Sequence, residues 1–282
     1  MTDAMYGRHF GLREAPFAIT PDTSFVYDCQ AHQEALNVLM VALDAGEGFI
    51  KITGDVGTGK TLLCRRVLAT LGSDYVTAYL PNPLLEPRGL MAALGTELGL
   101  ELTPRDDPHH LLRSLNDTLV RLMAQDKRVV VLIDEAQAMP LATLETLRLL
   151  SNLETEKRKL LQVVLFGQPE LDRNLDKPQV RQIKQRITFH YSIDTLARHE
   201  LRHYLRHRMS VAGYNGPQIF SPLALWFLHR ATGGVPRLVN ILAHKALLLV
   251  YAEGEDRAGI RHVLAAARDT ASARHVLIPW LV

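Results

Sequence analysis

A glycine-rich stretch has the residue types and spacing that hold phosphate. It reads Gly54-Asp55-Val56-Gly57-Thr58-Gly59-Lys60-Thr61 and fits the pattern G-x-x-x-x-G-K-[ST]. The glycines let the backbone turn sharply, so that successive amide N–H groups point into one concavity. A helix that starts at this point adds the positive end of its dipole. The stretch, with Leu62 after it, therefore predicts a nucleotide site in which Lys60 reaches the β- and γ-phosphates and Thr61 binds Mg²⁺.

Two carboxylates follow a continuous apolar run, Val129–Ile133. Such a run is typical of a strand that is buried on both faces of a parallel sheet. Because ligands of these sheets bind outside the carboxyl ends of the strands, we expect Asp134 and Glu135 to face the nucleotide. Asp134 would hold Mg²⁺ largely through water, and Glu135 would accept a proton from the attacking water. The alternative is a pair of solvated acids at the end of a strand.

Further polar residues are weaker candidates. Gln168 ends the next apolar strand, where it could contact the γ-phosphate, position water, or only make a turn. Arg181, Arg186 and Arg237 could stabilise charge that develops on a transferred phosphoryl group. Taken singly, each arginine is more simply interpreted as a solvated surface residue.

The segment from Arg198 to Arg208 is locally basic. Arg198, Arg202 and Arg206 recur every four residues, as do His199, His203 and His207. This periodicity could build an anion-binding face for DNA or acidic lipid, or a histidine metal site. A solvated helix face is the interpretation that we favour.

Strands and helices alternate before these arginines. Helical spacing is found at 32–45, 62–68, 89–98, 111–122 and 141–156, and strands are expected at 49–53, 75–80, 129–133, 161–167 and 187–193. Alternation of this kind predicts a parallel α/β sheet with helices on both faces. After residue 196 only helices are expected, at 198–211, 222–231, 236–251 and 257–271. We therefore predict an α/β domain over 1–195 and a small helical domain over 196–282.

Composition excludes several classes of protein. The chain has 282 residues and a net charge of only +2, which gives no global electrostatic case for nucleic-acid binding. Two cysteines do not make a disulfide framework. Neither a signal peptide nor a membrane-spanning run is found. We expect a cytoplasmic protein, with attachment to the inner-membrane surface as the alternative.

The chain resembles an AAA+ ATPase, a P-loop NTPase, in the motifs that it carries in this order: Gly54–Thr61, Asp134-Glu135, Gly167–Leu171, Gln185–Ile187 and Gly233–Arg237. A finer resemblance is to secretion ATPases of the general secretion pathway protein A type, because Phe10–Phe17 with Thr20-Pro21-Asp22 is similar to their N-terminal signature. This resemblance implies a three-layer α/β/α sheet in the order 5-1-4-3-2, a helical lid, ATP or ADP with Mg²⁺, and ring-like oligomers with ATP at subunit interfaces. It also implies residue roles: Gln168 as a sensor, Arg186 as the arginine finger with Arg181 as the fallback, and Arg237 as the lid arginine.

The implied function is ATP hydrolysis that drives assembly of a type IV pilus or a type II secretion machine at the inner membrane. Because the chain ends at Val282 without a further domain, it also resembles the ATPase of mannose-sensitive haemagglutinin (MSHA) pilus biogenesis. Two alternatives remain. One is a DNA-binding ATPase of the transposition kind, although DNA is not favoured, and the other is a slow nucleotide switch or scaffold.

Overall fold

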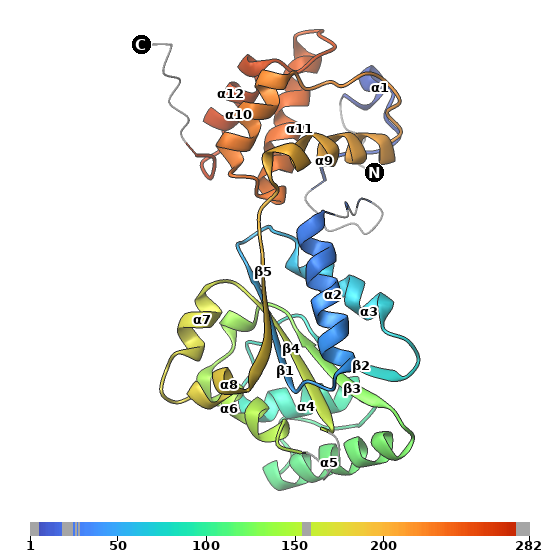
Figure 1. Ribbon diagram of the computed structural model, residues 1–282, viewed down its shortest axis with the longest axis vertical. Helices are drawn as coiled ribbons and strands as arrows, with labels where there is room; N and C mark the ends of the chain where they lie inside the picture. The colour runs from blue at the N-terminus through green and yellow to red at the C-terminus, as the bar shows by residue number, and fades with distance from the viewer. Residues whose placement is uncertain (1–5, 19–24, 26, 28, 154–158, 275–282) are drawn as a thin grey trace. The chain divides into compact units, whose positions relative to one another are not determined.

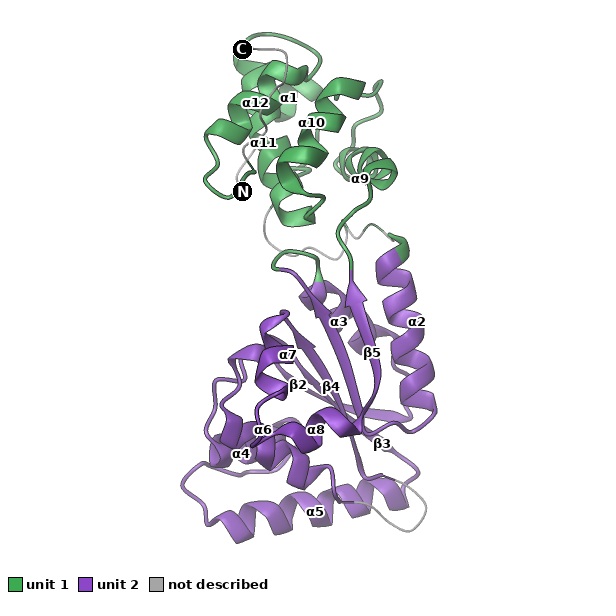
Figure 2. Cartoon of the chain, turned by 60° about the vertical axis from the view of Figure 1, so that its left-hand side comes forward, with its two compact units in different colours: residues 1–30, 56–59, 194–282 green, residues 31–55, 60–193 purple. Residues whose placement is uncertain are grey.

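The computed structural model describes residues 6–18, 25, 27, 29–153 and 159–274. The chain divides into two compact units (Figure 2). One comprises residues 31–55 and 60–193 and contains the sheet. The other comprises residues 1–30, 56–59 and 194–282 and is helical.

All neighbouring strands of the sheet run parallel. The strands are β1 (Phe49–Gly54), β2 (Tyr75–Leu80), β3 (Arg128–Ile133), β4 (Leu161–Gly167) and β5 (Ile187–Ile193). Their order, β2-β3-β4-β1-β5, is the predicted order counted from the opposite edge, so this prediction is confirmed. The ends of β1, β3 and β4, which carry the predicted nucleotide residues, therefore lie on one edge of the sheet.

Helices cover both faces of this sheet (Figure 1). Alternate strand residues define the two faces: Val130 and Leu132 pack in one apolar cluster, whereas Val129 and Val131 pack in the other. The first cluster includes residues of α2 (Gln30–Asp44) and α3 (Lys60–Thr70). The second includes residues of α4 (Pro87–Glu97), α5 (Pro108–Ala124), α6 (Leu141–Leu150), α7 (Glu170–Leu175) and α8 (Arg181–Arg186).

The helical unit contains five helices among the described residues. They are α1 (Gly7–Phe10), α9 (Arg198–Val211), α10 (Pro222–Thr232), α11 (Pro236–Ala252) and α12 (Ile260–Arg268). In the part of the chain that the structure describes, no helix has the length and apolar character required to cross a bilayer.

The N-terminal segment packs on these helices. The Arg13 amide donates to the Ala212 carbonyl oxygen (2.8 Å), and the buried Arg208 Nε donates to the Pro16 carbonyl oxygen (2.6 Å). Phe17 is buried against Phe220 at an edge-to-face angle. These contacts group residues 1–30 with the helices, whereas the sequence placed them with the sheet. The signature residues Thr20-Pro21-Asp22 lie outside the described residues.

Candidate nucleotide site

The predicted phosphate loop connects β1 to α3, which begins at Lys60. Gly57 and Gly59 have φ angles of 84° and 96°, a left-handed conformation that glycine adopts without strain. Lys60 is buried, and its Nζ donates to the carbonyl oxygens of Gly54 (2.8 Å) and Asp55 (2.9 Å). The loop therefore has the backbone geometry of a phosphate cradle, with an ammonium group held against it.

Electrostatic effects at Lys60 oppose one another. Burial lowers the pKa of Lys60 below the usual value for lysine, and the nearby Glu135 and Asp134 carboxylates partly offset this effect. Of the other predicted loop residues, Asp55 and Val56 are exposed, Leu62 is partly buried and Thr58 is buried.

Thr61 and Asp134 lie together although 73 positions separate them in the sequence. The Thr61 hydroxyl in the first turn of α3 donates to Oδ2 of Asp134, directly after β3, over 2.6 Å. Asp134 is only 3% exposed. A hydroxyl and a carboxylate are the hard oxygen ligands that Mg²⁺ prefers, so this pair fits the predicted metal.

The carboxylate of Glu135 is held by two amides. Its Oε2 accepts hydrogen bonds from Nε2 of Gln137 (2.5 Å) and from Nε2 of Gln168 (3.0 Å). The Gln168 backbone N–H in turn donates to Oε1 of Gln137 (3.0 Å). Glu135 itself has a φ of 51°, unusual for a residue other than glycine, and its N–H donates to Oδ1 of Asp134. Gln137 and Gln168 thus fix the orientation of the Glu135 side chain, while Asp134 holds its backbone.

Gln137 was not predicted from the sequence. It lies in the short 3-10 turn Ala136–Ala138 after β3, and its carbonyl oxygen accepts from Nδ2 of Asn174 in α7 (3.0 Å). Its only sequence signal is an amide side chain two positions after Glu135. The sequence does place Gln168 at the end of β4, and the structure brings it to Glu135.

Arg186 lies away from these groups. It is the last residue of α8, directly before β5, and its Nη1 donates to the Ser151 hydroxyl (3.2 Å). The amino end of β5 is at the opposite edge of the sheet from Asp134, Glu135 and Gln168. A strand of this length spans roughly 20 Å. Arg186 therefore does not reach Asp134 or Glu135 of its own chain. Arg181 is exposed at the start of α8.

Arg237 contacts the phosphate loop within the helical unit. Its backbone N–H donates to the Gly57 carbonyl oxygen (3.3 Å), and a Cβ placed on residue 57 would lie 2.6 Å from the Arg237 Cβ. Glycine at position 57 is thus required by this close approach as well as by its φ angle. The Arg237 side chain is exposed.

The basic helix is α9. Arg198, Arg202 and Arg206 are exposed on it, as the periodicity suggests. Arg208 differs, because it is buried against the Phe25 ring (4.9 Å from the ring centroid). Within the described residues, the histidines of α9 do not belong to any group of side chains that could hold a metal ion.

The fold is that of the P-loop NTPases, in the AAA+ arrangement. The solved structures of Aeropyrum pernix ORC2 with ADPNP and ADP and of Pyrobaculum aerophilum Cdc6p match with TM-scores of 0.62 and 0.65. The ORC2 match covers 91% of this chain and 73% of ORC2 at 17% sequence identity. The Cdc6p match covers 89% of this chain and 71% of Cdc6p at 16% sequence identity. The Thermotoga maritima RuvB branch migration motor matches with a TM-score of 0.56 at 19% identity, over 87% of this chain and 70% of its own.

Sequence comparison gives a more particular relative. Residues 43–175 match a family model described as an AAA domain. Over 253 residues the chain is 44% identical to general secretion pathway protein A of Aeromonas hydrophila. The match covers 90% of this chain and 46% of that protein, so the chain spans about half the length of this relative.

Proposed function

We propose that this protein binds ATP with Mg²⁺ and hydrolyses its β–γ phosphoanhydride bond. The observation that carries this proposal is the hydrogen bond between Thr61 and Asp134 beside the oriented carboxylate of Glu135. It joins the first turn after the phosphate loop to the end of β3, where a metal-bound phosphate chain would lie. The AAA-domain match over residues 43–175 supports the same chemistry.

Each residue has a separable role in this reaction. Lys60 would exchange its two carbonyl acceptors for phosphate oxygens, while amides of the loop and of the start of α3 bind the remaining oxygens. Thr61 and Asp134 would hold Mg²⁺, which neutralises charge on the phosphates. Glu135 would take the proton of the attacking water, and Gln137 and Gln168 would aim its carboxylate.

The reaction also needs a cation near the γ-phosphoryl group that is transferred and the ADP that leaves. We assign this role to Arg186 acting on the ATP of a neighbouring subunit, because the length of β5 keeps it from its own site. Arg237 would sense the γ-phosphate, which its contact with Gly57 of the phosphate loop supports. Turnover would then depend on assembly into a homo-oligomer, such as a ring.

The name of the Aeromonas relative supports a role in secretion. We propose that hydrolysis drives assembly of a type II secretion machine or an MSHA-like type IV pilus. The partners would be components of that machine at the inner membrane, and the protein would act from the cytoplasmic side.

One observation favours a second function, dependence on DNA. The exposed arginines of α9 repeat at helical spacing, and one solved structure with this fold, Aeropyrum pernix ORC1, is in complex with DNA. A slow nucleotide switch is a third form of the proposal, in which the ATP-bound state exposes a partner surface while turnover is slow.

The test is ATP hydrolysis measured against protein concentration, with and without duplex DNA, beside the Lys60→Ala variant. Turnover per subunit that rises steeply with concentration and ignores DNA supports an interface-dependent assembly ATPase. Turnover that requires DNA supports the second function. Slow turnover with oligomers that form on ATP addition supports the switch. Hydrolysis that persists in Lys60→Ala would overturn the proposal in all three forms.

A further inference from the structure

A groove of about 310 Å³ lies in the helical unit, apart from the phosphate loop. Five residues of α9 line it: Arg202, Leu205, Arg206, Met209 and Ser210. They recur at i, i+3, i+4, i+7 and i+8, so they form one face of the helix. The volume corresponds to roughly ten water molecules and lies at the lower end of the range for ligand pockets.

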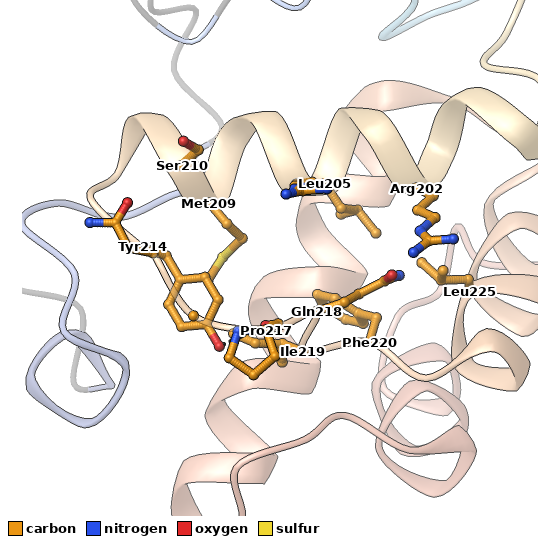
Figure 3. Close-up of a pocket in the computed structure, with 13 residues that line it drawn as sticks. Arg202, Leu205, Met209, Ser210, Tyr214, Pro217, Gln218, Ile219, Phe220 and Leu225 are labelled. Carbon is orange, nitrogen blue, oxygen red and sulfur yellow. Dashed lines mark hydrogen bonds between the residues drawn. The ribbon is translucent and has the colours of Figure 1, made fainter.

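The facing wall is the segment that connects α9 to α10. Tyr214 donates its hydroxyl hydrogen to the Pro217 carbonyl oxygen (2.8 Å), and its ring lies so close to Gly216 that a Cβ there would clash. Ile219 and Phe220 follow in the same segment, are buried and also line the groove. Figure 3 shows Tyr214 and Pro217 at one end of the groove and Arg202, near Phe220 and Leu225, at the other. Contacts within the chain thus hold this wall in place.

The groove has an apolar floor and a cationic, amide-bearing rim. Leu205, Met209, Ile219 and Phe220 are each at most 4% exposed. Arg202 and Arg206 on the rim are exposed and form no ion pair with any residue that the structure describes. None of the thirteen lining residues is acidic. An occupant must therefore bring an apolar group together with negative charge.

We propose that this groove docks a short acidic peptide segment of a partner protein, with a large apolar side chain on the floor and a carboxylate at Arg202 and Arg206. Peptide is favoured by the exposed Asn215 and Gln218, whose amides offer both a donor and an acceptor to a peptide backbone. A DNA backbone offers phosphate acceptors alone and nothing for the apolar floor. The groove is also small for the acyl chain of a lipid.

The experiment is a selection of random heptapeptides on the 282-residue chain, followed by affinity measurement with the synthetic peptide that is selected. Expected sequences place Asp or Glu within two positions of Leu, Phe or Met. Arg202→Glu should weaken binding of that peptide about tenfold or more, because a rim attraction becomes a repulsion. Leu225→Ala should weaken it by removing part of the apolar lining, which Leu225 contributes from α10.

Arg198→Glu is the matched control. It makes the same change of charge on an exposed arginine of α9 that does not line the groove, and it should alter affinity less than about twofold. Thermal melts confirm that each variant folds, and ATP turnover without peptide should be the same in all. Selection of no acidic–apolar pattern, or equal binding by Arg202→Glu, overturns the proposal. Labelled duplex DNA and phosphatidylserine vesicles are tested in the same way. The peptide proposal is overturned in favour of one of these ligands if that ligand binds, if Arg202→Glu abolishes its binding while Arg198→Glu does not, and if no peptide binds.

Discussion

Glu135 is the residue on which the proposed chemistry depends. Glu135→Gln keeps the size of the side chain but removes its ability to accept a proton, so turnover should fall at least about 100-fold. ATP affinity should remain close to that of the wild type, since Lys60, Thr61 and Asp134 are intact. Phosphate release and fluorescent-nucleotide binding measure the two effects separately. Normal turnover in this variant would remove Glu135 from the mechanism.

Gln137 should act through Glu135 rather than on the nucleotide. Gln137→Ala removes one of the two amide donors to Oε2 of Glu135 and leaves the other, Gln168, without its Gln137 partner. We expect kcat to fall about tenfold while KM changes less than about twofold. Gln137→Asn should not restore the rate, because its shorter amide cannot span the same distance. A raised KM with unchanged kcat would contradict a positioning role.

Residue types predicted most of this site because phosphate, Mg²⁺ and proton transfer each require a particular side chain. Lys60, Thr61, Asp134 and Glu135 follow from such requirements and from their places beside buried strands. Gln137 does not, because an amide in a short turn has many uses. Its role depends on the left-handed backbone of Glu135 and on the position of Gln168, and neither is visible in local spacing.

At the scale of elements, burial explains which predictions hold. The five strands lie within a residue of their predicted ends. In β3 and β4 this is because runs buried on both faces are strongly apolar, whereas alternate residues of β5 are exposed. The helices α7 and α8 were not predicted, since six residues are too few to show a period. The helix predicted at 257–271 begins only at Ile260, because Ala258 instead forms a bridge with Phe220.

The contact between β1 and α7 contains a partly buried ion pair. Lys51 Nζ donates to Oδ1 of Asp172, with the lysine side chain 10% exposed and the aspartate side chain 41% exposed. Asp172→Ala should lower the unfolding free energy by about 1–2 kcal/mol, because it leaves a charge without a partner, although solvent screens the exposed carboxylate. The double variant with Lys51→Met should recover much of this loss. Urea unfolding of the wild type, the two single variants and the double variant completes a double-mutant cycle. If the losses in unfolding free energy of the single variants add up to that of the double variant, the pair is not coupled.

The packing of the N-terminal segment on α11 should make stability depend on pH. The Tyr6 hydroxyl lies 2.7 Å from Nδ1 of His244, and burial lowers the pKa of His244 below its usual value of 6.5. The unfolded chain therefore takes up this proton first as pH falls. The stabilising contribution is complete above pH 6.5 and is lost as pH falls through the lower pKa of the folded state.

The comparison is between the wild type and His244→Gln, unfolded by urea from about pH 7.5 down to about pH 5. The wild type should lose stability more steeply on acidification, because glutamine does not titrate. All other histidines are common to both proteins, so the difference between the curves isolates His244. Parallel curves would contradict the prediction.

At the scale of the whole molecule, a parallel sheet separates two sets of groups. The phosphate and carboxylate residues follow the carboxyl ends of β1, β3 and β4, whereas Arg186 precedes the amino end of β5. An arginine in that place can serve a nucleotide only if the nucleotide belongs to another subunit. The role that we propose for Arg186, together with the direction of the strands, therefore makes turnover depend on assembly.

Mixed oligomers test this dependence directly. Arg186→Ala should bind ATP but hydrolyse it slowly, because its site receives no guanidinium from an identical neighbour. Lys60→Ala should not bind ATP, but its Arg186 is intact and can complete the ATP site of a neighbouring subunit. Mixing the two inactive variants should restore part of the wild-type turnover, since some interfaces then combine an intact loop with an intact arginine.

The controls separate this result from effects on folding. Arg186 donates to the Ser151 hydroxyl, and Ser151→Ala removes that hydrogen bond without removing the guanidinium. It also removes the bond that Ser151 donates to the Arg148 carbonyl oxygen, so it loses at least as much local structure as Arg186→Ala. Ser151→Ala should therefore hydrolyse ATP at close to the wild-type rate. Arg181→Ala, at the other end of α8, identifies the alternative finger if Arg186→Ala stays active. Mixtures that form oligomers but show no restored turnover would mean that Arg186 does not act across the interface.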